Sequence, residues 1–300
     1  MHSLLVSICI PTYNGEQFIV EAIQSAIEQT YANLEIVISD DASNDETLKL
    51  IEKFKEKTKI PIHIYHHQPS SIGANWNNCI KKAKGSYIKF LFQDDVLEPT
   101  CIDEMVSLAL CDDEIGLIYC KRNFIYNPNN NIHNEWIKDY GILHQSWNNL
   151  IINRSCIIEG NKLLKNMNLL KFPENKIGEP TAVLLKKECF DKVNFFDTEL
   201  KQSLDIEFWY RVMKKFKVGF VDNALIKFRL HDEQASFINL NNFLNESELL
   251  EFKIYKNLFW KLNKKVKLQL FLKFNFFGKK FVIFQLILKR IKRKIKLLAD

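Results

Sequence analysis

Several sequence patterns that mark common enzyme classes are missing from this chain of 300 residues. There is no Gly-x-Gly-x-x-Gly fingerprint and no P-loop lysine motif, which disfavours a dinucleotide oxidoreductase and a P-loop kinase. The seven cysteines form no Cys-x-x-Cys pair and no His/Cys cluster at zinc spacing. Cys9 and Cys79 lie in apolar surroundings and are expected to be small core residues. This cysteine usage favours a reducing compartment, and we expect the cytoplasm.

Long apolar runs are missing as well. No stretch approaches the roughly 20 apolar residues that a membrane-spanning helix needs. Met1, His2 and Ser3 lead directly into a strand-like segment, so no signal peptide is expected. Glycine and proline are scarce, with 9 and 7 residues, whereas 47% of the chain is hydrophobic. That share is enough to bury a sizeable core.

Charge is distributed unevenly along the chain. From Lys261 to Asp300 there are thirteen Lys or Arg and one acidic residue, a local charge of +12. Because the whole chain carries +6, the residues before this tail carry −6. The body is therefore mildly acidic and the tail strongly basic. The acidic body and the lack of a recognisable RNA or DNA module disfavour a nucleic-acid partner.

Strands and helices alternate over the first hundred residues. Apolar runs predict buried strands, and the amphipathic segments between them predict helices. Such alternation implies right-handed βαβ units, and hence an α/β fold with a doubly wound, mostly parallel sheet. The expected strands are Leu4–Ile10, Leu34–Ser39, Ile60–Tyr65 and Tyr87–Phe92, and the expected helices are Glu16–Thr30, Glu46–Lys57 and Trp76–Ala83.

Three of these strands end in polar clusters. Pro11–Asn14 follows the first strand, Asp40–Asp45 the second and Asp94–Asp95 the fourth. The carboxyl ends of parallel strands lie at one edge of a sheet, where ligands bind in open α/β folds. Adjacent carboxylates repel each other unless a cation lies nearby, and Mg²⁺ or Mn²⁺ carrying substrate phosphates is the natural occupant. The clusters predict a nucleotide site, with a solvated Asp-Asp turn as the alternative.

Three blocks of sequence resemble one enzyme family. They read VSICIPTYNGEQFIVEAIQSAIEQTYANLEIVISDDASNDET, GANWNNCIKKAKGSYIKFLFQDD, and SLDIEFWYR with FRLHDEQAS. Over about residues 4–236 the chain is similar to the family 2 glycosyltransferases, inverting enzymes of the GT-A fold that use nucleotide-sugar donors. The resemblance implies a catalytic domain over 1–236, with a nucleotide-sugar half at about 1–110 and an acceptor half at about 111–236.

By position, the resemblance assigns the base-binding residues. Pro11 and Tyr13 would form the floor and the stacking wall for the nucleotide base, and Asn14 would shape the loop. Asp41 would accept a hydrogen bond from a base N–H. These assignments are physically reasonable. An aromatic ring stacks on a base of any identity, whereas a carboxylate can accept a hydrogen bond only from a ring N–H, which uracil offers. A UDP-sugar is therefore favoured, a dTDP-sugar presents the same N–H, and a guanosine donor stays open.

The resemblance also assigns a metal site. Asp94 would contact the ribose or the donor sugar, and Asp95 with His231 would ligate Mn²⁺ or Mg²⁺; imidazole suits Mn²⁺ better. Two positions depart from the family. Gln93 stands where many members have a carboxylate. Trp76 stands where many have an arginine, so it supplies no charge to the diphosphate and is alternatively a core residue.

The same resemblance assigns the catalytic base. Asp205 lies in the first turn of the expected helix Ser203–Lys214, where the helix dipole supports a negative charge. An inverting transfer needs one carboxylate to take the proton of the acceptor hydroxyl, and Asp205 would fill that role. Glu207 is the runner-up. Glu179 is an expected acceptor contact, with a capping or ion-paired role as the alternative.

Residues 112–170 are the least regular part of the sequence. Gly116–Cys120 predicts a strand, and Asn127–Asn134 a loop rich in Pro and Asn. Acceptor specificity tends to lie here in such enzymes. The aromatic residues of this irregular stretch either contact the acceptor or pack internally; they are Trp136, Tyr140 and Trp147.

Residues 237–300 predict a helical, basic tail. Lys265–Leu298 interleaves Phe, Leu and Ile with Lys and Arg. A basic helix with an apolar, aromatic-rich face is typical of binding to an anionic membrane surface. Binding of a nucleic acid is an alternative use of such a positive charge. Packing on the catalytic domain or on a second subunit is a third interpretation. The oligomeric state stays open.

The leading hypothesis is therefore a glycosyltransferase at the cytoplasmic face of the membrane. It would extend a glycan or lipid-linked acceptor in surface polysaccharide or lipopolysaccharide synthesis. A sugar nucleotidyltransferase would need a Gly-rich loop with Arg and Lys after the first strand, which PTYNGEQF does not provide. A non-catalytic, membrane-anchored domain is the third reading, against which the intact Asp41, Asp94, Asp95 and Asp205 argue.

Overall fold

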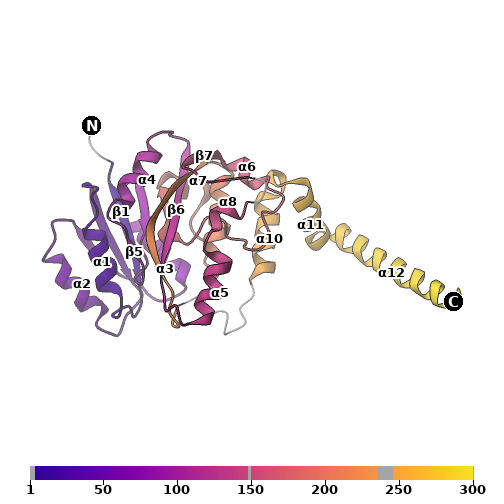
Figure 1. Cartoon of the computed structure of the whole chain (residues 1–300), viewed down its shortest axis with the longest axis horizontal. Coiled ribbons are helices and arrows are strands. Elements are labelled where there is room, and N and C mark those ends of the chain that lie inside the picture. Colours follow the sequence, from indigo (N-terminus) through magenta and orange to yellow (C-terminus); the bar gives the residue numbers. More distant parts are fainter. Residues whose placement is uncertain (1–3, 148–149, 235–245, 300) are drawn as a thin grey trace.

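The computed structural model describes residues 4–147, 150–234 and 246–299, and only the backbone of 290–299. Its strands are β1 (Val6–Thr12), β2 (Leu34–Asp40), β3 (Ile62–His66), β4 (Tyr87–Phe90), β5 (Val96–Leu97), β6 (Ile115–Ile125), β7 (Cys156–Glu159), β8 (Val183–Lys186) and β9 (Lys217–Arg229). They form one sheet in the order β3-β2-β1-β4-β8-β6-β9-β5, with β7 paired to β9 (Figure 1).

Helices cover both faces of this sheet. Apolar side chains of α1 (Ile19–Ile27), α2 (Thr47–Lys55) and α4 (Cys101–Ala109) form one core layer. Those of α3 (Ile72–Lys82), α6 (Gly160–Leu164), α7 (Glu188–Val193) and α8 (Leu204–Met213) form the other. Two short 3₁₀ turns, η1 (Leu143–Gln145) and η2 (Pro180–Ala182), complete the body. The α/β class with helices on both faces is the architecture that the alternating pattern predicts.

The first four strands in the sheet order are parallel, as expected. β1 pairs with β2 and with β4, and β2 pairs with β3, all in parallel. The register sets Thr12 beside Asp40 and Cys9 beside Phe90, so the three polar strand ends meet at one edge. The second half is mixed, because β8 lies antiparallel between β4 and β6. β9 is one strand of 13 residues.

The predicted loop Asn127–Asn134 is wrong over its second half. A helix, α5 (Asn131–Tyr140), begins there, and the Asn130 side chain caps it by accepting from the Ile132 and His133 N–H groups. Trp136 stacks on Phe228 of β9 with 5.3 Å between ring centroids. The helix therefore depends on an Asx-type cap and on tertiary aromatic packing, and its polar sequence gave no apolar period to detect.

Two tryptophans whose roles could not be decided from the sequence are core residues. Trp76 is buried against Phe90, Phe92 and Phe196, with ring centroids 4.9–5.9 Å apart. Trp147 is fully buried in the same layer. Packing rather than ligand contact therefore explains both side chains.

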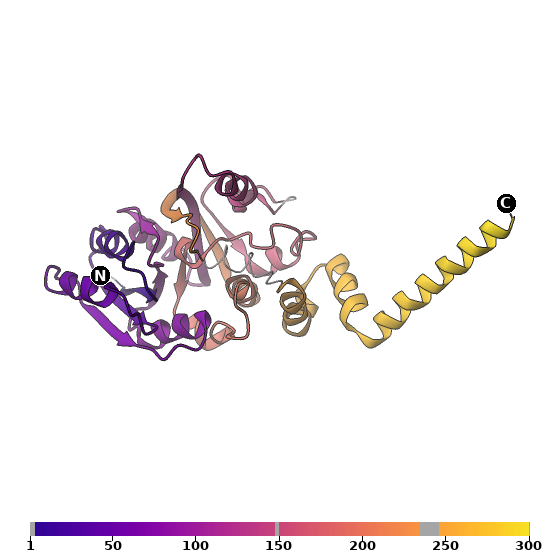
Figure 2. The same cartoon turned by 90° about the horizontal axis from the view of Figure 1, so that it is seen from below.

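The C-terminal tail divides into a packed part and a projecting part. α10 (Ser247–Leu258), η3 (Phe259–Lys261) and α11 (Lys264–Phe274) follow one another, and α10 and α11 bury apolar residues in the body's core. α12 (Phe276–Ala299) extends away from the body (Figures 1 and 2). The predicted boundary at 236/237 lies outside the described residues. Among the described helices none is both long and apolar enough to cross a bilayer.

Candidate active site

The ends of β1 and β2 are joined by a network of hydrogen bonds. Asp40, fully buried, accepts from the hydroxyls of Thr12 and Ser43. Asn14 adopts φ 45° and donates its backbone N–H to Ser43 Oγ. Its side-chain oxygen accepts from the Asn44 N–H at 3.0 Å. These hydrogen bonds join the two loops into one unit.

Tyr13 projects from this unit with 57% of its surface exposed. Gln93 holds its backbone on both sides: Oε1 accepts from Tyr13 N–H at 2.9 Å, and Nε2 donates to Tyr13 O at 3.0 Å. A Cβ at Gly15 would lie 2.4 Å from Gln93 Oε1, so a larger residue there would displace the Gln93 side chain. An exposed ring on a fixed backbone is suited to stacking on a flat ligand. Pro11, by contrast, is buried within β1.

Asp41 lies beside His67, which follows β3. A hydrogen bond of 2.6 Å joins His67 Nδ1 and Asp41 Oδ1, and both side chains are less than one-fifth exposed. This contact fixes one carboxylate oxygen of Asp41. The second oxygen keeps its acceptor capacity on the partly exposed side of the loop.

Asp94 and Asp95 have different surroundings. Asp94 is partly exposed, and its Oδ2 lies 3.0 Å from His231 Nε2. Asp95 is buried, with 1% of its surface exposed, and its Oδ1 accepts from the Arg229 N–H at 3.0 Å. Arg229 also donates from Nε to the Asp94 carbonyl oxygen at 2.8 Å. The end of β9 therefore holds the Asp94–Asp95 turn in place.

The chemistry of Asp95 fits a cation. Its Oδ2 is buried and makes no hydrogen bond of normal geometry to the described residues. Burial and the neighbouring charge of Asp94 raise the pKa of Asp95 well above its ordinary value. A divalent ion would stabilise the charged form and occupy the orphaned oxygen. No three His, Cys, Asp or Glu side chains of the described chain converge, but Mg²⁺ and Mn²⁺ sites often use one or two carboxylates with substrate phosphates.

A cavity of about 340 Å³ adjoins this turn. Its lining includes Phe18, whose ring lies 4.9 Å from that of His231 and under the Arg229 guanidinium. Asn130 and His133, from the α5 end, line its other side. Aromatic, amide and imidazole groups together are a lining that suits a sugar ring. Residues of the 112–170 region thus line this cavity.

Asp205 lies at the first turn of α8, and 9% of its surface is exposed. Asn175 Nδ2 donates to its Oδ2 at 2.9 Å, and the Ile206 N–H to its Oδ1 at 2.7 Å. Burial raises the pKa of Asp205 to about 7, and the charge of Glu179 adds to the rise. A carboxylate with a pKa near neutrality is suited to general base catalysis.

Glu207, the alternative base, has a different environment. Its two carboxylate oxygens each lie 2.8 Å from Arg211 Nε, and only 3% of Glu207 is exposed. Arg211 also donates to the backbone oxygen of Phe195. The pair ties α8 to the segment after α7, which is a structural role.

Glu179 precedes η2 and pairs with Arg122 of β6 through both carboxylate oxygens. Arg122 is almost fully buried and also donates to the Tyr140 carbonyl oxygen. The charge of Glu179 raises the pKa of both Asp95 and Asp205. Glu179 is therefore close enough to act electrostatically on the two carboxylates, and it is itself ion-paired.

Sequence reasoning missed the residues that hold the site residues in place. His67, Gln93, Arg122, Asn175 and Arg229 each contact a predicted site residue or its backbone. Arg229 lies in the segment FRLHDEQAS, and Gln93 departs from the family pattern. The sequence assigned a positioning role to neither residue. Their contacts span 26 to 134 residues, which no local pattern reveals.

Residues 7–193 match the sequence profile described as Glycosyl transferase family 2. The chain belongs to this family. It is 28% identical over 238 residues to the UDP-Glc:alpha-D-GlcNAc-diphosphoundecaprenol beta-1,3-glucosyltransferase WfgD of Escherichia coli, covering 79% of this chain and 81% of the relative. An uncharacterized glycosyltransferase of Rickettsia typhi is 29% identical over 251 residues, covering 83% and 71%.

Solved structures show the same GT-A fold for this glycosyltransferase. S. aureus TarS 1–349 superposes with a TM-score of 0.62 at 16% identity, covering 91% of this chain and 73% of TarS; it has also been solved with UDP-GlcNAc. The mannosyltransferase PcManGT from Pyrobaculum calidifontis, in complex with GDP-Man and Mn²⁺, has a TM-score of 0.55 at 14% identity, covering 94% and 79%.

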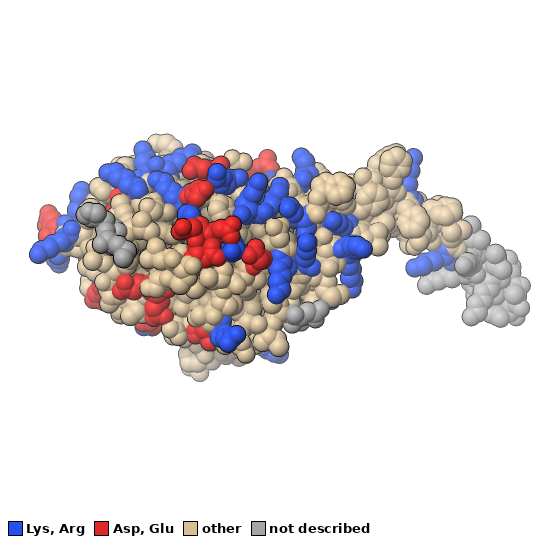
Figure 3. Space-filling model, turned by 90° about the horizontal axis from the view of Figure 1, so that it is seen from above, with Lys and Arg blue, Asp and Glu red and all other residues tan. Residues whose placement is uncertain are grey.

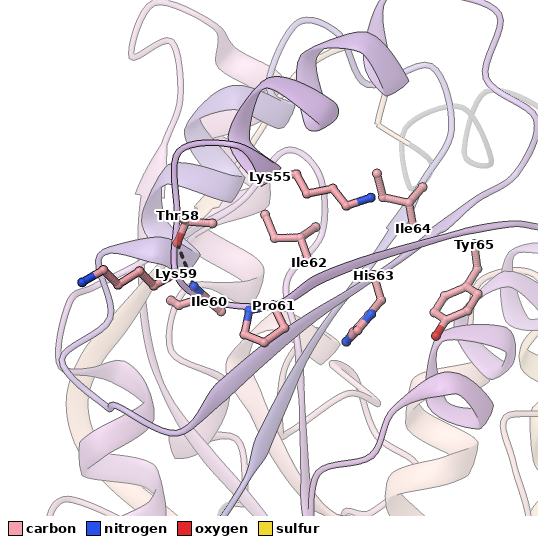
Figure 4. Close-up of a pocket in the computed structure, with 9 residues that line it drawn as sticks. All are labelled: Lys55, Thr58, Lys59, Ile60, Pro61, Ile62, His63, Ile64 and Tyr65. Atoms are coloured by element: carbon pink, nitrogen blue, oxygen red, sulfur yellow. Dashed lines mark hydrogen bonds between the residues drawn. The ribbon is translucent and has the colours of Figure 1, made fainter.

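A second cavity, of about 480 Å³, lies at the β3 edge of the sheet (Figure 4). It is lined by the end of α2 and by Thr58–Tyr65. No predicted site residue lines it. β3 is the end strand in the sheet order, so this cavity lies apart from the Asp94–Asp95 turn.

Proposed function

We propose that this glycosyltransferase moves a sugar, with inversion, from a nucleotide diphosphate sugar to an acceptor hydroxyl. The observation that carries the proposal is the presence of two kinds of buried carboxylate, Asp95 and Asp205, in a chain of this family. Asp95 keeps a buried, unpartnered oxygen beside Asp94, which suits a cation, and Asp205 has a pKa of about 7, which suits a base. Glu179 acts electrostatically on both Asp95 and Asp205, which supports one shared site.

The donor base would stack on Tyr13 and donate to Asp41. Tyr13 is exposed on a backbone that Gln93 clamps, and His67 orients the Asp41 carboxylate. Uracil offers the N–H that a carboxylate needs, so we favour a UDP-sugar, with a dTDP-sugar as the alternative. The relative WfgD is named for UDP-Glc and TarS has been solved with UDP-GlcNAc, which supports this choice.

Mn²⁺ or Mg²⁺ would be held by Asp95 and His231 at the Asp94–Asp95 turn. The ion would neutralise charge on the leaving diphosphate. Asp94, freed from His231 Nε2, would bind ribose or donor-sugar hydroxyls. Arg229 keeps the turn in place through its bonds to the Asp94 carbonyl oxygen and Asp95 Oδ1. The Mn²⁺ in the mannosyltransferase structure supports a cation in this fold.

Asp205 would act as the general base. Its carboxylate takes the proton of the acceptor hydroxyl while that oxygen bonds to the anomeric carbon. The bond from the anomeric carbon to the diphosphate oxygen breaks, and the nucleoside diphosphate leaves with its electron pair. The single displacement inverts the anomeric centre, so the chain needs no covalent nucleophile.

We propose that the acceptor is a glycan or a lipid-linked glycan in surface polysaccharide or lipopolysaccharide synthesis at the cytoplasmic membrane face. The E. coli relative's name specifies a diphosphoundecaprenol-linked acceptor, which supports this class. Glu179 would bind an acceptor hydroxyl from its place beside Arg122.

A transfer assay tests the proposal. Purified full-length protein is incubated with Mn²⁺, a short lipid-linked acceptor and UDP-, dTDP- or GDP-sugars, and the anomeric configuration of the product is read by NMR. We expect product of inverted configuration with one nucleotide class, and none with Asp205→Asn. A retained configuration would contradict the mechanism. If the protein transfers no sugar and binds no nucleotide, the alternative of a non-catalytic, membrane-anchored domain would be favoured.

A further inference from the structure

α12 carries a large apolar surface that the described protein does not cover. Nine bulky apolar side chains between residues 276 and 288 are 37–73% exposed. They are Phe276, Phe277, Phe281, Val282, Ile283, Phe284, Leu286, Ile287 and Leu288. The helix touches the rest of the molecule mainly through α11, and it projects from the body in two perpendicular views (Figures 1 and 2). A contiguous exposed apolar surface of this kind marks an interaction site.

Four of these nine residues form a stripe along one side of the helix, and the other five lie elsewhere around it. Phe277, Phe281, Phe284 and Leu288 follow the spacing i, i+4, i+7 and i+11, so they share one side of the helix. Gln285 and Lys289 lie away from this stripe at 100° per residue. We call the four stripe residues the aromatic face of α12. An aromatic stripe on a helix rich in Lys and Arg is typical of a helix that lies in a lipid interface.

Gly278 fixes the direction in which the helix leaves the body. A Cβ at this position would lie 2.2 Å from the Phe271 carbonyl oxygen and 2.8 Å from Leu272 Cα. Only glycine therefore permits this close crossing of α11 and α12. α11 is itself anchored, because Val266 and Leu270 are buried in the core. The corner is thus a defined joint and not a loose linker.

The charge of this segment decides which partner it fits. From Phe274 to Ala299 the sequence contains eight Lys and Arg and no acidic residue. Figure 3 shows Lys and Arg also gathered on the body next to the projecting helix. Two copies of α12 packed together would bring these cations side by side. An anionic lipid surface instead attracts each cation, at about 1 kcal/mol per Lys or Arg.

We propose that α12 is an interfacial membrane helix, whose aromatic face enters an anionic bilayer while α10 and α11 stay part of the catalytic body. The proposal narrows the predicted tail: the segment that binds lipid begins near Gly278, not at Lys265. It is also independent of the donor, the metal and the base, because none of these residues lies on α12.

Flotation of the full chain with vesicles tests it. The vesicles contain phosphatidylcholine with or without phosphatidylglycerol. We expect strong binding only to the anionic vesicles, weakened by added salt. The double variant Phe281→Ser/Phe284→Ser should bind at least tenfold more weakly. The matched control Val282→Ser/Leu286→Ser removes apolar side chains from the opposite side of the same helix and should retain most of the binding.

Three results would overturn the proposal. They are equal binding to neutral and anionic vesicles, equal loss in the two double variants, and unchanged binding in Phe281→Ser/Phe284→Ser. Light scattering of the same proteins without lipid gives the remaining check. A dimer that Phe281→Ser/Phe284→Ser converts to a monomer would assign the aromatic face to a second copy of the chain. Nucleotide binding by every variant separates these results from failure of the proposed function.

Discussion

His67 Nδ1 lies 2.6 Å from Asp41 Oδ1, in a contact that links the chain after β3 to the loop after β2. The bond leaves the second Asp41 oxygen as the acceptor that a base N–H would use. In the proposed donor site, this contact would make His67 a positioning residue for nucleotide recognition.

Replacing His67 tests this relationship. His67→Leu removes the bond and lets the Asp41 carboxylate rotate, so the KM for the donor should rise about tenfold while kcat stays nearly constant. A tenfold change corresponds to about 1.4 kcal/mol of uniform binding. His66→Leu, at the exposed neighbouring position, is the control and should change neither constant. A fall in kcat alone would assign His67 another role.

The clamp on Tyr13 gives a second prediction. Gly15→Ala places a Cβ where Gln93 Oε1 lies, so the Gln93 side chain must move and Tyr13 loses its two bonds. We expect UDP to bind at least tenfold more weakly, as measured by quenching of protein fluorescence or by calorimetry. Gln93→Ala should reproduce the loss without a clash. Normal affinity in both variants would show that the Tyr13 backbone needs no clamp.

The pKa of Asp205 predicts a pH dependence. The base acts as a carboxylate, and burial sets its pKa at about 7. Below that pH the carboxylate is progressively protonated, so kcat at saturating donor should fall about tenfold per pH unit. Above it, kcat should level off. Asp205→Asn should bind donor normally and lose at least a thousandfold in kcat. If Asp205→Asn keeps residual activity and its kcat still falls in the same way below pH 7, another group is responsible for the pH dependence.

Glu207 should show the opposite behaviour. Its buried pair with Arg211 is structural, so Glu207→Gln should lower the Tm and the free energy of unfolding by about 1–3 kcal/mol. The folded fraction should keep its pH profile and most of its kcat. A loss of kcat in a variant of unchanged Tm would make Glu207 the better candidate for the base.

The fold of the first hundred residues could be predicted from the sequence because its information is local. Apolar strands and amphipathic helices alternate, and parallel pairing brings every strand's carboxyl end to the same edge. The predicted strand Leu34–Ser39 differs from β2 by one residue. The predicted strand Tyr87–Phe92 runs two residues beyond β4, and Asp94 and Asp95 lie between β4 and β5.

The rest depends on contacts between distant segments. α5 has few apolar residues and is stabilised by stacking of Trp136 on Phe228. The spacing of apolar residues in the sequence does not indicate such a contact. Glu179 meets Arg122 across 57 residues, and their pairing required β6 and η2 to be adjacent. The tail was predicted as one basic segment, whereas burial of Val266 and Leu270 assigns α11 to the body.

Calorimetric titration of UDP into the full-length protein, with and without Mn²⁺, tests the proposed donor site most directly. TDP and GDP are titrated in parallel, and Asp95→Asn is the variant. Because Asp95 keeps an oxygen for a cation that would carry the diphosphate, we expect Mn²⁺-dependent UDP binding that weakens at least tenfold in Asp95→Asn. Binding of equal strength without the metal and in the variant, or no binding of any nucleotide, would contradict the proposal.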